Sequence, residues 1–186
     1  MTYPEALVVN GVEREVFTGY EDALAAIACI NDTDLSDIER AYGVIEILYK
    51  EPIPDEDAGE AVRMAVKYLL QGKDPGEPRA SSKVDMDYEH DMHYIRSSFR
   101  SDYGIDLNRE PGLHWWEFME LLQGLSDGCI LNRVRDVRNY DLNSIKDPKA
   151  KSRMIQAQRE LALPNQLNKE DEETLDAFYA QFNQPE

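Results

Sequence analysis

Helical spacing of apolar residues is the feature that most constrains how this chain can fold. The clearest case runs from Ala58 to Leu70, where apolar side chains recur every three or four residues and form a stripe about 100° wide. Such a stripe must be buried against another element. Helical spacing recurs at residues 20–30, 35–49, 88–103, 115–125, 130–137 and 148–161. The chain is therefore expected to be mainly α, an array or bundle of about six to seven helices.

A small β-hairpin is predicted before the first helix. Residues 6–9 and 12–17 flank the pair Asn10-Gly11. An Asn-Gly pair supplies the positive φ angles that a tight hairpin turn requires. Because an isolated two-stranded hairpin is only marginally stable, this one is expected to pack on a helix.

Capping and breaking residues predict where the segments begin and end. Asp34 is a candidate N-cap for the second helix, and Gly72 should end the third. A stretch rich in proline, glycine and serine follows Gly72 and has no apolar period. The expected segments are a hairpin plus helical half at 1–72, a linker or exposed loop at 73–83, a C-terminal helical half at 84–163, and an acidic, flexible tail at 164–186.

The net charge limits the kinds of partner. The chain of 186 residues has a formal net charge of −17. Nucleic acids and anionic membranes both require clustered Lys and Arg, so neither is an expected partner. The N-terminus has neither the basic nor the apolar part of a signal peptide, and no apolar run is long enough to span a bilayer. The expected location is the cytoplasm, and the expected partners are proteins.

One segment is basic within this acidic chain. Residues 129–160 hold 4 acids and 8 bases. A solvated helix face would explain them. The alternatives are self-association against the acidic N-terminal half and capture of an acidic segment of another protein. Arg133, Arg135 and Arg138 are therefore candidate partner-binding residues.

No set of residues predicts catalysis. His90 and His93 lie in an acidic stretch and form the most metal-like cluster, but acids at a helix start also suit the helix dipole. The sequence lacks a Gly-x-Ser-x-Gly nucleophile motif and a glycine-rich phosphate loop. The expectation is a protein that is not an enzyme and needs no cofactor. A metal-binding enzyme built on His90 and His93 is the less favoured alternative.

The densest apolar region surrounds two adjacent tryptophans. Neighbouring residues on a helix point about 100° apart, so both indoles can be buried only under wide cover. Core packing is one interpretation, and the other is an outward tryptophan that anchors a partner. The candidate binding or self-assembly residues here are Leu113, Trp115, Trp116, Phe118 and Leu122.

Two sequence blocks carry a resemblance to a known family. One is Tyr103-Gly-Ile-Asp-Leu107, and the other is Leu113-His-Trp-Trp-Glu-Phe118. With the hairpin and acidic helix of the front half, they resemble the phage Gp15 family over roughly residues 5–160. That family is found in tail modules of long-tailed phages and prophages of Gram-positive bacteria.

The resemblance implies a role in tail morphogenesis. Genes of this family lie between those for the major tail protein and the tape-measure protein, where tail assembly chaperones are encoded. The expected function is therefore a chaperone that binds the tape-measure protein or tail subunits. The alternatives are a structural tail component that stays in the virion and a regulator of host defence or transcription. No catalytic residue carries over from the family.

Overall fold

The computed structural model describes residues 2–73, 84–109 and 112–164. Across these ranges it contains seven α-helices and one antiparallel hairpin, which confirms the predicted mainly α fold with a small β element. Within the same residues, no helix combines the length and apolarity needed to cross a membrane. The expected linker and acidic tail lie, apart from Lys73 and Pro164, outside the described residues.

The chain divides into two compact units, and neither is continuous in sequence. Unit 1 comprises Met1–Ser82 and Gly104–Gly124, whereas unit 2 comprises Lys83–Tyr103 and Leu125–Glu186. The segment Gly104–Gly124, which has the tryptophan pair, therefore packs with the N-terminal helices.

The hairpin of unit 1 forms as predicted. Strand β1 (Ala6–Val9) pairs with strand β2 (Val12–Glu15), and Asn10 and Gly11 have φ angles of 47° and 83°. Its inner face packs on helix α3, as expected for a hairpin that cannot stand alone. The second strand was expected to reach residue 17, but β2 ends at Glu15. The next residue, Val16, forms an isolated bridge with Tyr49, which follows the second helix.

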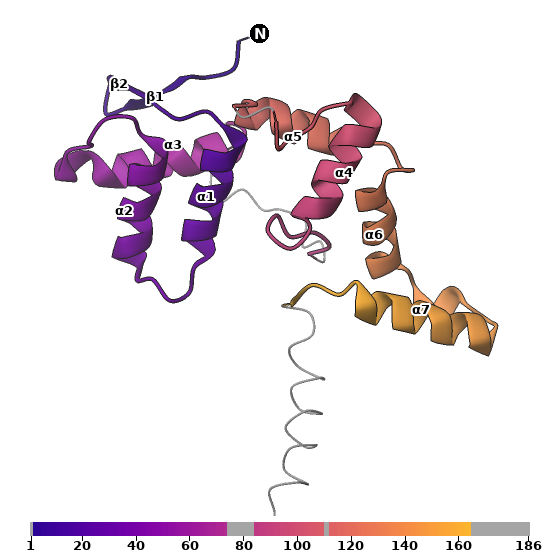
Figure 1. Ribbon diagram of the computed structural model, residues 1–186. Coiled ribbons are helices and arrows are strands. Elements are labelled where there is room, and N and C mark those ends of the chain that lie inside the picture. Colours follow the sequence, from indigo (N-terminus) through magenta and orange to yellow (C-terminus); the bar gives the residue numbers. More distant parts are fainter. Residues whose placement is uncertain (1, 74–83, 110–111, 165–186) are drawn as a thin grey trace, which may run out of the picture. The chain divides into compact units, whose positions relative to one another are not determined.

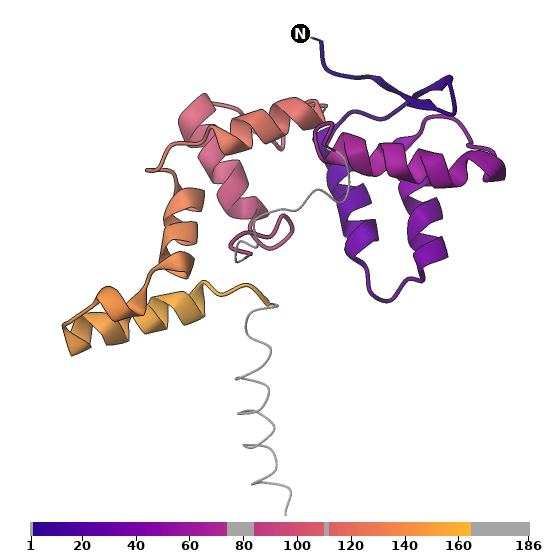
Figure 2. The ribbon, with the colours of Figure 1, turned by 180° about the vertical axis from the view of Figure 1, so that it is seen from behind.

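Three helices complete the N-terminal part of unit 1. Helices α1 (Tyr20–Asn31) and α2 (Asp37–Leu48) lie side by side, and α3 (Ala58–Leu69) crosses their ends (Figures 1 and 2). Gly43 permits the close approach of α1 and α2, because a Cβ atom at this position would lie 2.6 Å from Cys29 Sγ.

The N-cap of α2 differs from the sequence prediction. Ser36, not Asp34, caps the helix and forms a capping box with Glu39. The backbone N–H of Asp34 instead bonds to Asp32 Oδ1 in a local turn. Asp and Ser are both preferred at the N-cap of a helix. At Ser36 the capping box also gives the Ser36 backbone N–H a partner, the Glu39 side chain.

Helix α5 (Trp115–Gln123) joins unit 1 through a short backbone pairing. The Tyr20 N–H donates to Leu113 O at 2.9 Å, and the Trp115 N–H donates to Thr18 O at 2.7 Å. The start of α1 and the start of α5 are thereby held together.

Unit 2 contains helices α4 (Met92–Tyr103), α6 (Ile130–Asn139) and α7 (Pro148–Glu160). Helices α4 and α6 pack together through the buried side chains Ile95, Phe99, Leu131 and Val134. Asp147 caps the start of α7. No residue of α7 is fully buried, so this helix covers unit 2 only loosely.

Candidate protein-binding surfaces

The two tryptophans of α5 both hydrogen-bond the end of α3. Trp115 Nε1 donates to Leu69 O at 3.1 Å, and Trp116 Nε1 donates to Tyr68 O at 3.0 Å. The last carbonyls of a helix have no partner within the helix. The Trp115 indole satisfies Leu69 O, and the Trp116 indole adds a second donor to Tyr68 O, which also accepts the Gln71 N–H. The tryptophan pair thus helps to cap the C-terminus of α3.

Trp115 is part of the core of unit 1. Its side chain is 1% exposed, and its ring stacks on Phe118 at a centroid distance of 5.7 Å. Phe118 stacks in turn on Tyr20 at 4.8 Å, and the Tyr20 hydroxyl donates to Leu107 O. Trp115 and Phe118 therefore stabilise the fold and are not accessible to a partner.

Trp116 is half-buried and only partly accessible. Its indole stacks on Tyr68 at 6.1 Å and lies above Gly72, where a Cβ atom would be 3.5 Å from the ring. Leu113 is also half-buried, and Leu122 is buried. Of the five predicted residues around the tryptophans, Leu113 and Trp116 alone retain accessible surface.

His114 fixes the start of α5. Its Nδ1 accepts the backbone N–H of Trp116 at 3.0 Å, and its Nε2 lies 3.0 Å from Pro4 O. The carbonyl can only accept, so Nε2 carries the proton and the ring is held in one tautomer. The histidine thus ties the N-terminal segment to α5, a structural role that sequence reasoning did not assign.

Arg138, predicted as a partner-binding residue, is buried in unit 2. Its guanidinium donates twice to the Asp91 carboxylate, at 2.6 and 2.7 Å, and also to Leu161 O and Asp85 O. Burial alone would raise the pKa of Asp91. The hydrogen bonds from Arg138 and from the Asp87 N–H outweigh burial and hold the pKa below its usual value. Arg138 therefore joins three segments of unit 2.

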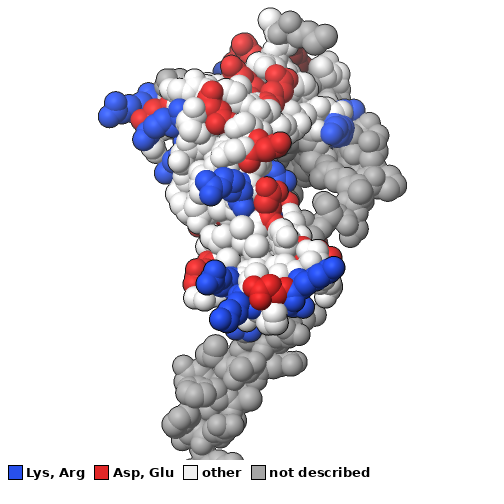
Figure 3. Space-filling view, turned by 90° about the vertical axis from the view of Figure 1, so that its right-hand side faces the viewer, with Lys and Arg blue, Asp and Glu red and all other residues white. Residues whose placement is uncertain are grey.

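The other basic residues of this region are more accessible. Arg135 is half-buried and pairs with Asp85 at 3.1 Å, and Arg133 is exposed. At the lower end of the described surface, where Figure 1 places α7, Figure 3 shows Lys and Arg on both sides of an acidic cluster. The accessible part of the predicted basic segment thus comprises Arg133, part of Arg135, Lys146 and the basic residues of α7.

The predicted site residues are divided between the two units. Those from Leu113 to Leu122 belong to unit 1, and the three arginines belong to unit 2. Four of the eight are buried inside their own unit: Trp115, Phe118, Leu122 and Arg138.

The candidate metal cluster has exposed histidines. His90 and His93 are both exposed at the start of α4, and the His90 backbone N–H bonds to Asp87 Oδ1. Within residues 2–73, 84–109 and 112–164, no group of three His, Cys, Asp or Glu side chains is arranged to hold a metal ion. In this region Asp87 serves as a local cap, whereas Asp85 and Asp91 pair with arginines of α6.

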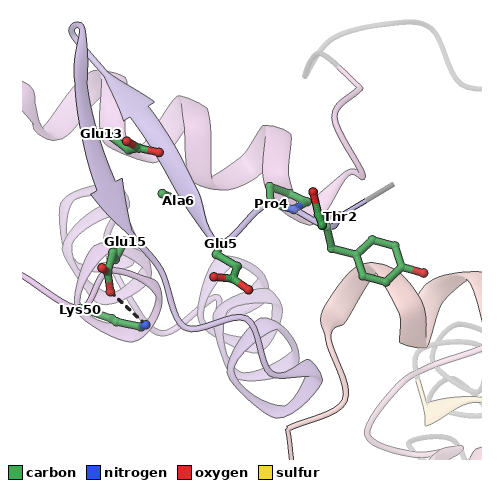
Figure 4. Close-up of a pocket in the computed structure, with 8 residues that line it drawn as sticks. Thr2, Pro4, Glu5, Ala6, Glu13, Glu15 and Lys50 are labelled. Carbon is green, nitrogen blue, oxygen red and sulfur yellow. Dashed lines mark hydrogen bonds and ion pairs between the residues drawn. The ribbon is translucent and has the colours of Figure 1, made fainter.

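The structure also shows an open depression on the outer face of the hairpin. It has a volume of about 720 Å³, and its lining residues with carboxylate or ammonium groups are Glu5, Glu13, Glu15 and Lys50 (Figure 4). Sequence reasoning missed it. The available signal was the pair of glutamates at alternate positions of β2, which places both on one face of the hairpin.

A buried hydroxyl in unit 1 provides a first test of the core. The Tyr68 hydroxyl is buried and has no hydrogen-bond partner among the described residues, and burial raises its pKa. Tyr68→Phe should therefore leave the free energy of unfolding unchanged or raise it by up to about 1 kcal/mol. The matched control is Tyr49→Phe, which removes a bond of 2.8 Å to Ala61 O and should cost about 1 kcal/mol. Urea unfolding measures both. A loss from Tyr68→Phe that equals the control would show that the hydroxyl does have a partner.

Comparison with known proteins gives one match. The family model described as Bacteriophage Gp15 protein matches residues 3–163 of the chain. No curated protein and no solved structure matches it.

Proposed function

Because the chain belongs to the Bacteriophage Gp15 protein family, we propose that it is a tail assembly chaperone that binds the tape-measure protein or tail subunits. The family match carries this proposal. The match supports the assignment of the chain as a phage structural or morphogenesis protein. It covers residues 3–163, from the hairpin to the end of the described part of unit 2.

The proposal is that the chain works by binding and not by catalysis. The residues that stand out chemically, Arg138 with Asp91 and the tryptophan pair, are engaged in packing. The net charge of −17 favours solubility and would help to keep an aggregation-prone partner in solution. The proposed site of action is the host cytoplasm during assembly.

Co-expression with the tape-measure protein of the same phage tests the proposal. The soluble fraction of the tape-measure protein should rise severalfold, and the two proteins should purify together. An unrelated acidic helical protein of similar size and charge is the control, because it separates specific binding from charge alone. Unchanged solubility of the tape-measure protein would contradict the chaperone role.

Mass spectrometry of purified phage particles then separates the chaperone from a structural component. A chaperone leaves before the particle is complete, so peptides of this chain should be absent. Their presence in fixed ratio to tail-tube subunits would indicate a protein that stays in the tail.

A further inference from the structure

The register of the hairpin defines which backbone groups face outward. The Val16 N–H donates to Glu5 O at 3.1 Å, and Ala6 lies opposite Glu15. Hydrogen-bonded and non-hydrogen-bonded pairs alternate along an antiparallel ladder. The N–H and C=O groups of Leu7 therefore point to β2, whereas those of Ala6 and Val8 point away from it.

The two edges of the hairpin differ. The outer edge of β2 is covered at its end, because the Lys50 N–H donates to Glu15 O and, just beyond the strand, the Phe17 N–H donates to Leu48 O. At the outer edge of β1, neither Ala6 nor Val8 has a backbone hydrogen bond to any described residue. The Val8 side chain is 54% exposed. An uncovered edge of this kind can pair with a strand from another chain.

The depression gives this edge a charge preference. Glu13 and Glu15 project from β2 on the outer face, next to Ala6 of β1 (Figure 4). Among the described residues that line it, Lys50 is the one cation, and its Nζ already pairs with Glu15 at 3.2 Å. A strand added beside β1 would place alternate side chains on this face. The small side chain of Ala6 would let a long cationic side chain reach across to the glutamates.

We propose that the free edge of β1 binds an extended segment of a partner protein, with Lys or Arg at alternate positions facing Glu13 and Glu15. Main-chain hydrogen bonds to Ala6 and Val8 supply the attachment, and the carboxylates select the charge. A second copy of this chain fits less well, because it would bring its own glutamates to the same face. The inference rests on the proposed function for the role of this partner in phage assembly.

Titration of the intact protein with synthetic peptides, followed by NMR, tests the edge. The probe is a nine-residue peptide of alternating lysine and valine, and the control is the same peptide with glutamate for lysine. The lysine peptide should shift the amides of β1, and the glutamate peptide should leave them unchanged. Absence of any shift in β1 with the lysine peptide would overturn the proposal.

Two variants separate the backbone contribution from the charge contribution. Val8→Pro removes an outward N–H without removing a bond to β2, and should weaken binding about tenfold. The matched control Val8→Thr keeps the N–H and should bind as the natural protein does. The double variant Glu13→Gln with Glu15→Gln should weaken binding severalfold and flatten its salt dependence. Equal binding by Val8→Pro and Val8→Thr would overturn strand addition, and salt dependence unchanged in the double variant would overturn the charge preference.

The same variants distinguish this inference from the proposed function. If Val8→Pro keeps the tape-measure protein soluble but no longer binds the peptide, chaperone activity stands and the β1 edge is not its site. If the natural protein binds the lysine peptide but does not affect the tape-measure protein, the docking edge stands and the chaperone role fails.

Discussion

Replacing Arg138 by methionine should lower the free energy of unfolding of unit 2 by about 3–5 kcal/mol. The substitution leaves the Asp91 carboxylate buried and without its cationic partner. It also removes the donors to Leu161 O and Asp85 O. Hydrogen exchange of the amides in α4 and α6 measures the loss. The matched control is Arg133→Met on the same helix, which changes an exposed arginine and should have an effect within about 0.5 kcal/mol.

This loss should depend on pH. Because the folded state lowers the pKa of Asp91, its carboxylate contributes stability above the unfolded pKa of about 3.9, and this contribution is lost as pH falls through the folded pKa. The penalty of Arg138→Met should therefore be large at neutral pH and shrink below about pH 4. Replacing Asp91 by leucine in the same chain should restore much of the stability, since an apolar pair can substitute for a buried ion pair. An equal penalty for Arg138→Met and Arg133→Met would show that the buried pair contributes little.

Trp115→Ala should cost unit 1 about 3–5 kcal/mol, which is the range for deleting a buried aromatic side chain. The change opens a cavity beside Phe118 and leaves Leu69 O without its donor. Trp116→Ala should cost less, about 1–2 kcal/mol, because this ring is half-buried although it also bonds α3. Both variants are compared by urea unfolding, followed by far-UV circular dichroism.

The two tryptophan variants also test the alternative that Trp116 anchors a partner. If Trp116→Ala abolishes co-purification with the tape-measure protein while its stability loss stays small, Trp116 contributes to binding directly. A stability loss from Trp116→Ala equal to that from Trp115→Ala would contradict the difference in burial between the two rings.

Local patterns predicted most of the secondary structure. The Asn10-Gly11 turn and the apolar stripe of residues 58–70 each depend on residues close in sequence, and both form as expected. The cap of α2 shows the limit of such patterns. Asp34 and Ser36 are both good capping residues, and the capping box with Glu39 favours Ser36.

The candidate site was less predictable, because its geometry depends on contacts between distant segments. Nothing near Arg138 in the sequence indicates that Asp91 lies against it, and a basic helix face is expected to be solvated. In the same way, periodicity places Trp115 and Trp116 on a helix but cannot show that both indoles reach the end of α3. These long-range contacts bury Trp115 and Arg138, and no pattern of neighbouring residues contains them.

The discontinuous course of unit 1 has a consequence for synthesis on the ribosome. Tyr20 is covered by Phe118, which is translated after the first segment of unit 2. At about 5–20 residues per second, the ribosome needs on the order of 2–8 s to pass from residue 82 to residue 124. During that interval the nascent chain carries an unfinished unit 1, in which Tyr20 of α1 still lacks the ring of Phe118 that covers it in the folded protein.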